Sequence, residues 1–325
     1  MHSSISNSEA GARVVPGTAV DAPRQTPESY VRWSIRAIAC LALFCAALEG
    51  LTRYGFSHIS RIEARIASEH QAALAIRRGS RPTLLMIGNS LMLEGIDYVR
   101  LQNELAPEAS VVRFPIEQTQ YLDWYYGLRR IFGEGSQPDM VVLCMSAEHL
   151  IDSRIRGDYS AYYLFRLADI PQIRREIDYD LTKTSGLVLA RFSLFYAGRS
   201  PLRNFVLVRT DPAYAAMLQR LAPTQAHFPP DREMERIAEI RLTDLRNLCS
   251  SHGARFAYLL APGFGPGEAP LVEAGIQSHT DVMHPVHLNE WGGEKFRDGF
   301  HLNPAGARLF TDKVAPLLAQ RLSQH

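Results

Sequence analysis

Residues 84–90 read Leu84-Leu85-Met86-Ile87-Gly88-Asn89-Ser90, an apolar run that ends in a turn and delivers a serine. A short, continuous apolar run is typical of a strand that is buried on both faces of a parallel sheet. Gly88 allows backbone to approach closely at the turn, and Ser90 stands where a following helix is expected to begin. The stretch therefore predicts the first strand, turn and helix of an α/β fold.

The same alternation of apolar runs and helix-like stretches continues to the C-terminus. Five runs are expected to form buried strands: Thr83–Ile87, Ser110–Phe114, Met140–Leu143, Arg255–Leu260 and Val282–Val286. Helix-like stretches lie near residues 91–106, 118–133, 231–252 and 304–322. This order predicts a doubly wound α/β domain, residues 81–325, with a mainly parallel five-stranded sheet. In such sheets ligands bind beyond the carboxyl ends of the strands.

One connection is too long for a simple crossover between parallel strands. Far more residues separate Cys144 from Ala254 than one helix requires, so we expect a helical insertion at about residues 151–228. Its aromatic side chains are Tyr159, Tyr162, Tyr163, Phe165, Phe192, Phe195 and Tyr196. They would form a cap over a site or, as we expect for most of them, the insertion's own core.

The N-terminal region has a different composition. Residues 1–30 are rich in Ser, Ala, Pro and Gly and predict a disordered tail. The segment Ala37–Leu48 carries no charge. It extends to residues 31–52 if the flanking charged side chains reach the membrane surface, and its length is then close to the roughly 20 residues that a bilayer requires. We interpret it as a transmembrane signal anchor. A cleaved signal peptide and a buried helix are the alternatives. Arginines before and after the segment nearly balance, so charge does not fix its orientation.

Isoleucines recur at helical spacing after this segment. They predict an amphipathic stalk helix within residues 56–80, which Gly79 and Pro82 end. We expect it to pack against the domain's own surface, with self-association as the alternative.

Composition limits the remaining possibilities. The 325 residues are 46% hydrophobic, enough for one sizeable core. A formal charge of +1 gives no reason to expect a nucleic-acid partner. The four cysteines match neither a disulfide framework nor a zinc site, and we expect free or buried thiols.

A second short stretch, about two hundred residues after the first, supplies reactive groups. It reads Asp298-Gly299-Phe300-His301-Leu302-Asn303-Pro304, an Asp-x-x-His followed by a helix-start signal. In this interpretation Ser90 is the nucleophile and His301 is the base. The Asp298 carboxylate orients the base. Because Ser90 follows the first strand and the second stretch lies between the last strand and the last helix, both project from one edge of the sheet. The plain alternatives are a helix-capping Ser90 and a surface turn at Asp298.

Together the two stretches resemble the SGNH, or GDSL-type, hydrolase superfamily, across roughly residues 83–150 and 254–320. That resemblance rests on Gly88-Asn89-Ser90 and on Asp298-x-x-His301. With the N-terminal anchor, the chain further resembles membrane-anchored SGNH-like proteins of bacterial cell-envelope and exopolysaccharide O-acylation. The resemblance implies O-acetylation or deacetylation of a cell-surface polysaccharide through an acyl-Ser90 intermediate. It also implies a catalytic domain in the periplasm or outside the cell, and a membrane partner that supplies acyl groups.

The sequence departs from that superfamily at the expected oxyanion hole. Neither the usual glycine after the second strand nor the usual asparagine after the third is present. The Ser90 amide is one expected donor. The further candidates for the substrate and oxyanion site are Gly88, Asn89, Gln118, Thr119, Ser146 and His149. Since losing one donor typically costs ~10²–10³ in rate, this departure also indicates slow or specialised acyl transfer, or none.

No cofactor and no metal ion are expected. His279, His284 and His287, with Asp281 nearby, match no metal-binding spacing, and we interpret them as a loop with several histidines. No phosphate-binding glycine loop, redox Cys-x-x-Cys or nucleotide fingerprint occurs. The expected function is serine-dependent acyl transfer or ester hydrolysis. A plain esterase or lipase and a non-catalytic subunit of a polysaccharide assembly are the alternatives.

Overall fold

The central element is a five-stranded parallel sheet with the order β2-β1-β3-β4-β5. We describe it in a computed structural model that covers residues 27–214, 217 and 228–323. The strands are β1 (Thr83–Gly88), β2 (Ser110–Pro115), β3 (Met140–Met145), β4 (Arg255–Leu260) and β5 (Asp281–Met283). All pairings are parallel, as the apolar runs predicted, and the strand order reverses at β1. Such a reversal opens a crevice at the carboxyl ends of the strands.

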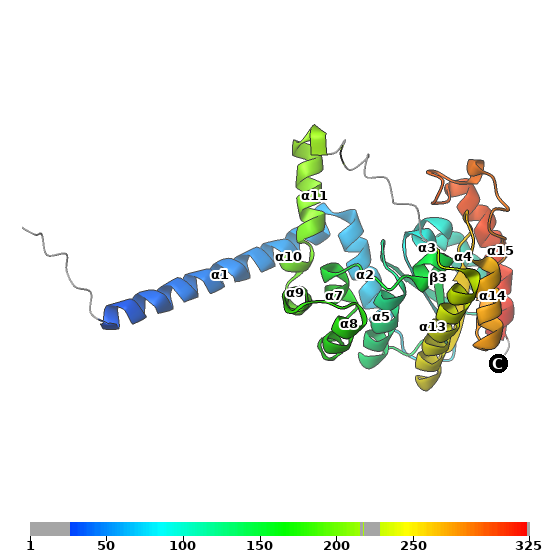
Figure 1. Ribbon diagram of the computed structural model, residues 1–325, viewed down its shortest axis with the longest axis horizontal. Coiled ribbons are helices and arrows are strands. Elements are labelled where there is room, and N and C mark those ends of the chain that lie inside the picture. The colour runs from blue at the N-terminus through cyan, green and yellow to red at the C-terminus, as the bar shows by residue number, and fades with distance from the viewer. Residues whose placement is uncertain (1–26, 215–216, 218–227, 324–325) are drawn as a thin grey trace, which may run out of the picture. The chain divides into compact units, whose positions relative to one another are not determined.

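Helices cover both faces of the sheet because successive strand residues point to opposite sides. Leu85 and Ile87 join a core beneath α2 (Arg61–Leu74), α5 (Tyr121–Gly133), α13 (Asp231–Ser251) and α14 (Glu268–Gln277). Leu84 and Met86 join a second core beneath α3 (Ser90–Gly95), α4 (Tyr98–Leu105) and α15 (Pro304–Ser323). In Figure 1, α2 and α5 lie side by side, and so do α5 and α13.

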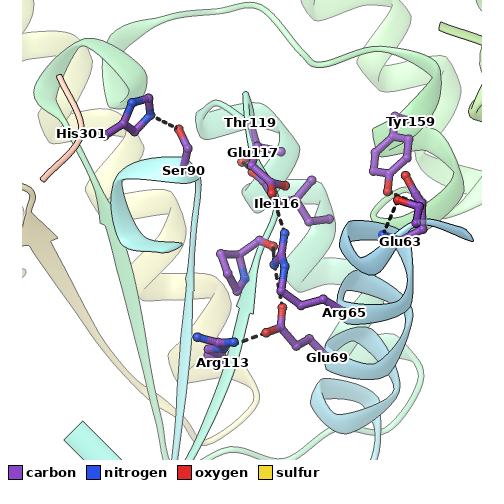
Figure 2. Close-up of polar contacts among 12 residues, drawn as sticks. Glu63, Arg65, Glu69, Ser90, Arg113, Ile116, Glu117, Thr119, Tyr159 and His301 are labelled. Carbon is purple, nitrogen blue, oxygen red and sulfur yellow. Dashed lines mark hydrogen bonds and ion pairs between the residues drawn. The ribbon is translucent and has the colours of Figure 1, made fainter. Parts of the chain in front are cut away.

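The expected stalk helix is α2, and it packs on the domain. Its Ile66 is fully buried in the first core, and the helix contacts β2 and α5. Arg65 binds Glu117, and Glu69 binds Arg113 (Figure 2). These ion pairs fasten the helix to β2 and to the loop that follows it.

Several elements differ from the expected bounds. Residues 91–106 form two helices, because the Asp97 side chain accepts a hydrogen bond from the Arg100 amide and starts α4 anew. The last strand ends at Met283 rather than Val286, since Pro285 has no N–H to donate to a sheet. Helix α14 was not expected. It contains Pro270 and Gly275, which weaken a helical sequence signal.

The predicted insertion contains short helices. They are α7 (Asp158–Tyr163), η1 (Leu167–Asp169), α8 (Ile170–Glu176), α9 (Leu181–Phe192), α10 (Leu194–Ala197) and α11 (Arg199–Thr210), preceded by α6 (Ala147–Ile151). Tyr159, Tyr163 and Phe165 are buried and join the first core, whereas Phe192 is 62% exposed. Most of these aromatics therefore extend the domain core rather than form a separate one. Residues 215–216 and 218–227 of the predicted insertion lie outside the described residues.

The chain divides into two compact units, residues 1–48 and 49–325, and helix α1 (Pro27–Ile59) contains the boundary. The stretch Tyr30–Phe56 is long and apolar enough to cross a membrane, by length and composition. A signal sequence near an N-terminus has the same properties. Residues 1–26 of the predicted tail lie outside the described residues.

Candidate active site

The turn after β1 places Ser90 at the crevice. Ser90 is the first residue of α3. A side chain at Gly88 would put its Cβ 2.2 Å from the carbonyl oxygen of Cys144 on β3. Only glycine therefore allows β1 and β3 to approach here.

Asn89, rather than Ser90, caps helix α3. Its side-chain oxygen accepts a hydrogen bond from the Leu91 amide at 3.0 Å, and its Nδ2 donates to the Thr119 carbonyl at 3.3 Å. Asn89 is fully buried, so its side chain fixes the turn between β1 and the loop after β2. The Ser90 hydroxyl is thereby left out of the capping interaction that was its plain alternative role.

His301 faces that hydroxyl. Its Nε2 lies 2.9 Å from Ser90 Oγ, and its Nδ1 lies 2.9 Å from Asp298 Oδ2 (Figure 2 shows the first contact). The three predicted residues thus form one hydrogen-bonded chain across 211 positions of sequence. With the proton on Nδ1 shared with Asp298, Nε2 is free to accept the proton of Ser90.

Asp298 is held as an anion. Partial burial would raise its pKa, but hydrogen bonds from the His301 amide and ring, the Phe300 amide and the Arg297 guanidinium hold the pKa well below its usual range. The two amides donate to Oδ1 at 2.8 and 3.1 Å, and Oδ2 accepts from the imidazole at 2.9 Å and from Arg297 at 3.2 Å. Arg297 also binds Glu94 on α3, an ion pair that sequence analysis did not anticipate. This pair links the histidine turn to the serine helix.

Thr119 does not contribute its side chain to an oxyanion hole. It is fully buried, its hydroxyl donates to the Ile116 carbonyl at 2.7 Å, and it accepts from Trp124 Nε1 at 2.8 Å. Both of its hydrogen-bonding directions are occupied within the protein. Thr119 instead supports Asn89 through its carbonyl.

Ser146 and His149 form a pair at the carboxyl end of β3. The Ser146 Oγ and His149 Nδ1 lie 2.5 Å apart. Burial lowers the pKa of His149 to about 4, so the ring is neutral at neutral pH. The Phe300 ring lies 6.0 Å from the His149 ring and 5.1 Å from the His301 ring, between centroids. The pair therefore lies near the turn that carries Asp298 and His301. The neutral His149 ring has one N–H that it can donate.

Gln118 is exposed and lies on a larger cavity. It adopts a left-handed backbone conformation, φ 63°, directly before Thr119. The cavity has a volume of about 660 Å³ and is bounded by the end of α1, the start of α2, α7 and α11. Glu63 lies at its wall and accepts a hydrogen bond from Tyr159 at 2.7 Å (Figure 2). The loop after β2 thus borders the cavity at Gln118 and contacts the serine turn at Thr119.

Among the residues that the structure describes, one group of side chains has ligand atoms suited to a metal ion. Glu268, His284 and His287 each place one such atom within 4.8 Å of the others. Sequence analysis considered the two histidines without Glu268, whose side chain comes from α14 and is brought to them only by the fold. His279 is not a member of this group.

No known family model matches the chain, and no curated protein matches it significantly. The interpretation of the site therefore rests on its geometry and on the two short motifs.

Proposed function

We propose that the protein catalyses serine-dependent acyl transfer or ester hydrolysis. The observation that carries the proposal is the chain of two 2.9 Å contacts from Ser90 Oγ through the His301 ring to Asp298. A hydroxyl, a base and an anionic carboxylate in this order are what nucleophilic catalysis by serine requires. The N-terminal position of Ser90 on α3 adds a backbone amide near the reacting atoms.

The proposed reaction has two steps. Ser90 Oγ attacks the carbonyl carbon of an acyl ester while His301 Nε2 takes the hydroxyl proton. Collapse of the tetrahedral intermediate breaks the ester bond, and His301 returns the proton to the leaving oxygen. In the second step His301 takes a proton from an acceptor hydroxyl, whose oxygen attacks the carbonyl carbon of the acyl-Ser90. The bond between that carbon and Ser90 Oγ then breaks, and His301 returns the proton to Ser90 Oγ.

The acceptor we propose is a cell-surface polysaccharide, with acetyl as the transferred group. This part rests on the resemblance of the two motifs to SGNH-type proteins and on an N-terminal apolar helix suited to an anchor or a signal sequence. A membrane-bound donor protein would supply the acyl group, and the catalytic domain would face the periplasm or exterior. Water as acceptor would make the protein a plain esterase.

One observation favours a second candidate, a non-catalytic subunit of a polysaccharide assembly. The Thr119 hydroxyl, near the place of a usual oxyanion donor, is fully engaged inside the protein. If His149 and backbone amides do not replace that donor, the triad would be present without the charge stabilisation that acyl transfer needs.

Turnover of a chromogenic acetyl ester tests the proposal. The full-length chain is assayed in detergent, with water and then an oligosaccharide as acceptor. Ser90→Ala and His301→Ala should each lower turnover by ~10⁴ or more, and the double variant should lose little further, because triad members act as a unit. Ser110→Ala, which changes an exposed serine on β2, should match the parent. Turnover in Ser90→Ala within tenfold of the parent would overturn the proposal.

A further inference from the structure

Two loops at the carboxyl edge of the sheet bring Glu268, His284 and His287 together. Glu268 is the first residue of α14, which follows β4, and both histidines lie in the loop after β5. Glu268 Oε1 lies 2.5 Å from His287 Nδ1 and 3.5 Å from His284 Nδ1. The carboxylate oxygen thus forms a hydrogen bond with the His287 ring and lies near the His284 ring without a hydrogen bond to it.

The spacing suits a tetrahedral metal ion. Nitrogen and oxygen ligands at about 2.0–2.1 Å from zinc lie about 3.3 Å from one another in a tetrahedral arrangement. The distance between Glu268 Oε1 and His284 Nδ1 is close to that value. The shorter contact to His287 is a hydrogen bond, and an ion would replace it if His287 Nδ1 moved away from Glu268 Oε1. His287 is the partner with room to move, since 67% of its side chain is exposed, compared with 19% for Glu268.

The carboxylate is oriented by a neighbouring amide. Glu268 Oε2 accepts a hydrogen bond from the Leu288 amide at 2.5 Å, so Oε1 faces the histidines. The loop that carries them is fastened in turn, because the Asn289 amide donates to the Gly263 carbonyl and its side chain bonds to the backbone of Gly265. Such outer contacts hold ligands in place before an ion binds.

One donor atom of the group lacks a hydrogen-bond partner. His284 Nδ1 is buried and accepts or donates no hydrogen bond among the residues that the structure describes. A buried ring nitrogen without a partner is costly, because it has lost its contact with water. A metal ion at this position would satisfy it.

We propose that Glu268, His284 and His287 bind a divalent transition-metal ion of the zinc type. Two imidazoles and one carboxylate are a ligand set that zinc accepts, and three protein ligands leave a fourth position for water. The ion would tie the loop after β5 to α14. Leu288 in that loop also lines a small cavity with Ser146 and Phe300. By fixing the loop, the ion would stabilise one wall of this cavity beside the candidate active site. This inference does not depend on the proposed acyl transfer.

Metal binding to the full-length chain tests the inference. The protein is stripped with a chelator, then titrated with zinc chloride in a calorimeter, and its bound metal is counted by elemental analysis. We expect one zinc ion per chain and a melting temperature that rises with zinc. His287→Ala and His284→Ala should each weaken binding by about 100-fold or more, since each removes one of three ligands.

His279→Asn is the matched control. His279 is exposed, outside the group, and has φ 51°, a backbone conformation that asparagine tolerates. It should bind zinc as the parent does. His287 is exposed, so its variant should fold even if His284→Ala does not. Absence of zinc binding by the parent, or equal binding by the parent and His287→Ala, would overturn the inference.

Discussion

Replacing Asp298 with asparagine tests how His301 is prepared to act as a base. In the structure Asp298 Oδ1 accepts two backbone amides, and Oδ2 faces His301 Nδ1 at 2.9 Å. Asparagine can keep its oxygen on the amides, which places its NH₂ group against Nδ1. That nitrogen must then be the acceptor, so the ring proton moves to Nε2 and faces Ser90. The turn is preserved while the base is lost.

The expected cost is large. A wrong histidine tautomer in a serine triad lowers kcat by about 10⁴, which corresponds to about 5 kcal/mol at 1.36 kcal/mol per factor of ten. The assay is acetyl-ester turnover at neutral pH, with folding checked by circular dichroism. Asp312→Asn is the matched control, because Asp312 pairs with Arg100 on the α4 side of the domain. If Asp298→Asn keeps activity within tenfold of the parent, Asp298 does not orient His301 and the reasoning fails.

Three further predictions concern stability and location. Gly88→Ala should lower the free energy of unfolding, measured in urea melts, by about 1–3 kcal/mol or more, because the alanine Cβ would lie 2.2 Å from the backbone oxygen of Cys144. An unchanged urea melt would contradict the close approach of β1 and β3. Burial lowers the pKa of His70 to about 4, below the 6.5 of an unfolded histidine, so the unfolded chain binds the extra proton and stability falls as pH drops from 6.5 to 4. Between pH 6.5 and pH 4, the free energy of unfolding of His70→Gln should fall by up to roughly 3 kcal/mol less than that of the parent. Equal decreases in the two proteins would refute the effect. The full chain should stay with membranes through an alkaline carbonate wash if Tyr30–Phe56 is retained as an anchor, whereas release would favour a cleaved signal sequence.

The sheet could be predicted because its strands carry a local signal. Continuous apolar runs such as Leu84–Ile87 are visible without knowing their neighbours, and all five expected strands are present. Helix α14 was missed because its burial against α13 and β5, rather than its own propensity, stabilises it. The end of β5 depended on Pro285, a single residue that outweighs the apolar pattern.

The candidate site was predictable only in part, because some of its contacts depend on the fold rather than on a local sequence signal. Asp298 and His301 are three residues apart, so a turn brings them together whatever the fold. Their approach to Ser90 followed from the edge of the sheet on which both stretches lie. That Asn89 caps helix α3, so that the Ser90 hydroxyl can face His301, depends on one side-chain hydrogen bond, which the sequence does not specify. Glu268 meets His284 and His287 only through the packing of two separate loops.

Labelling with a serine-reactive fluorophosphonate tests the central claim most directly, because it reports an activated nucleophile whatever the natural substrate is. The full-length chain should be labelled on Ser90, and labelling should be lost in both Ser90→Ala and His301→Ala. Ser110→Ala should be labelled like the parent. A folded parent chain that takes no label would contradict the account and favour the non-catalytic subunit. Label that persists in Ser90→Ala would also contradict it, because the reactive nucleophile would then be another residue.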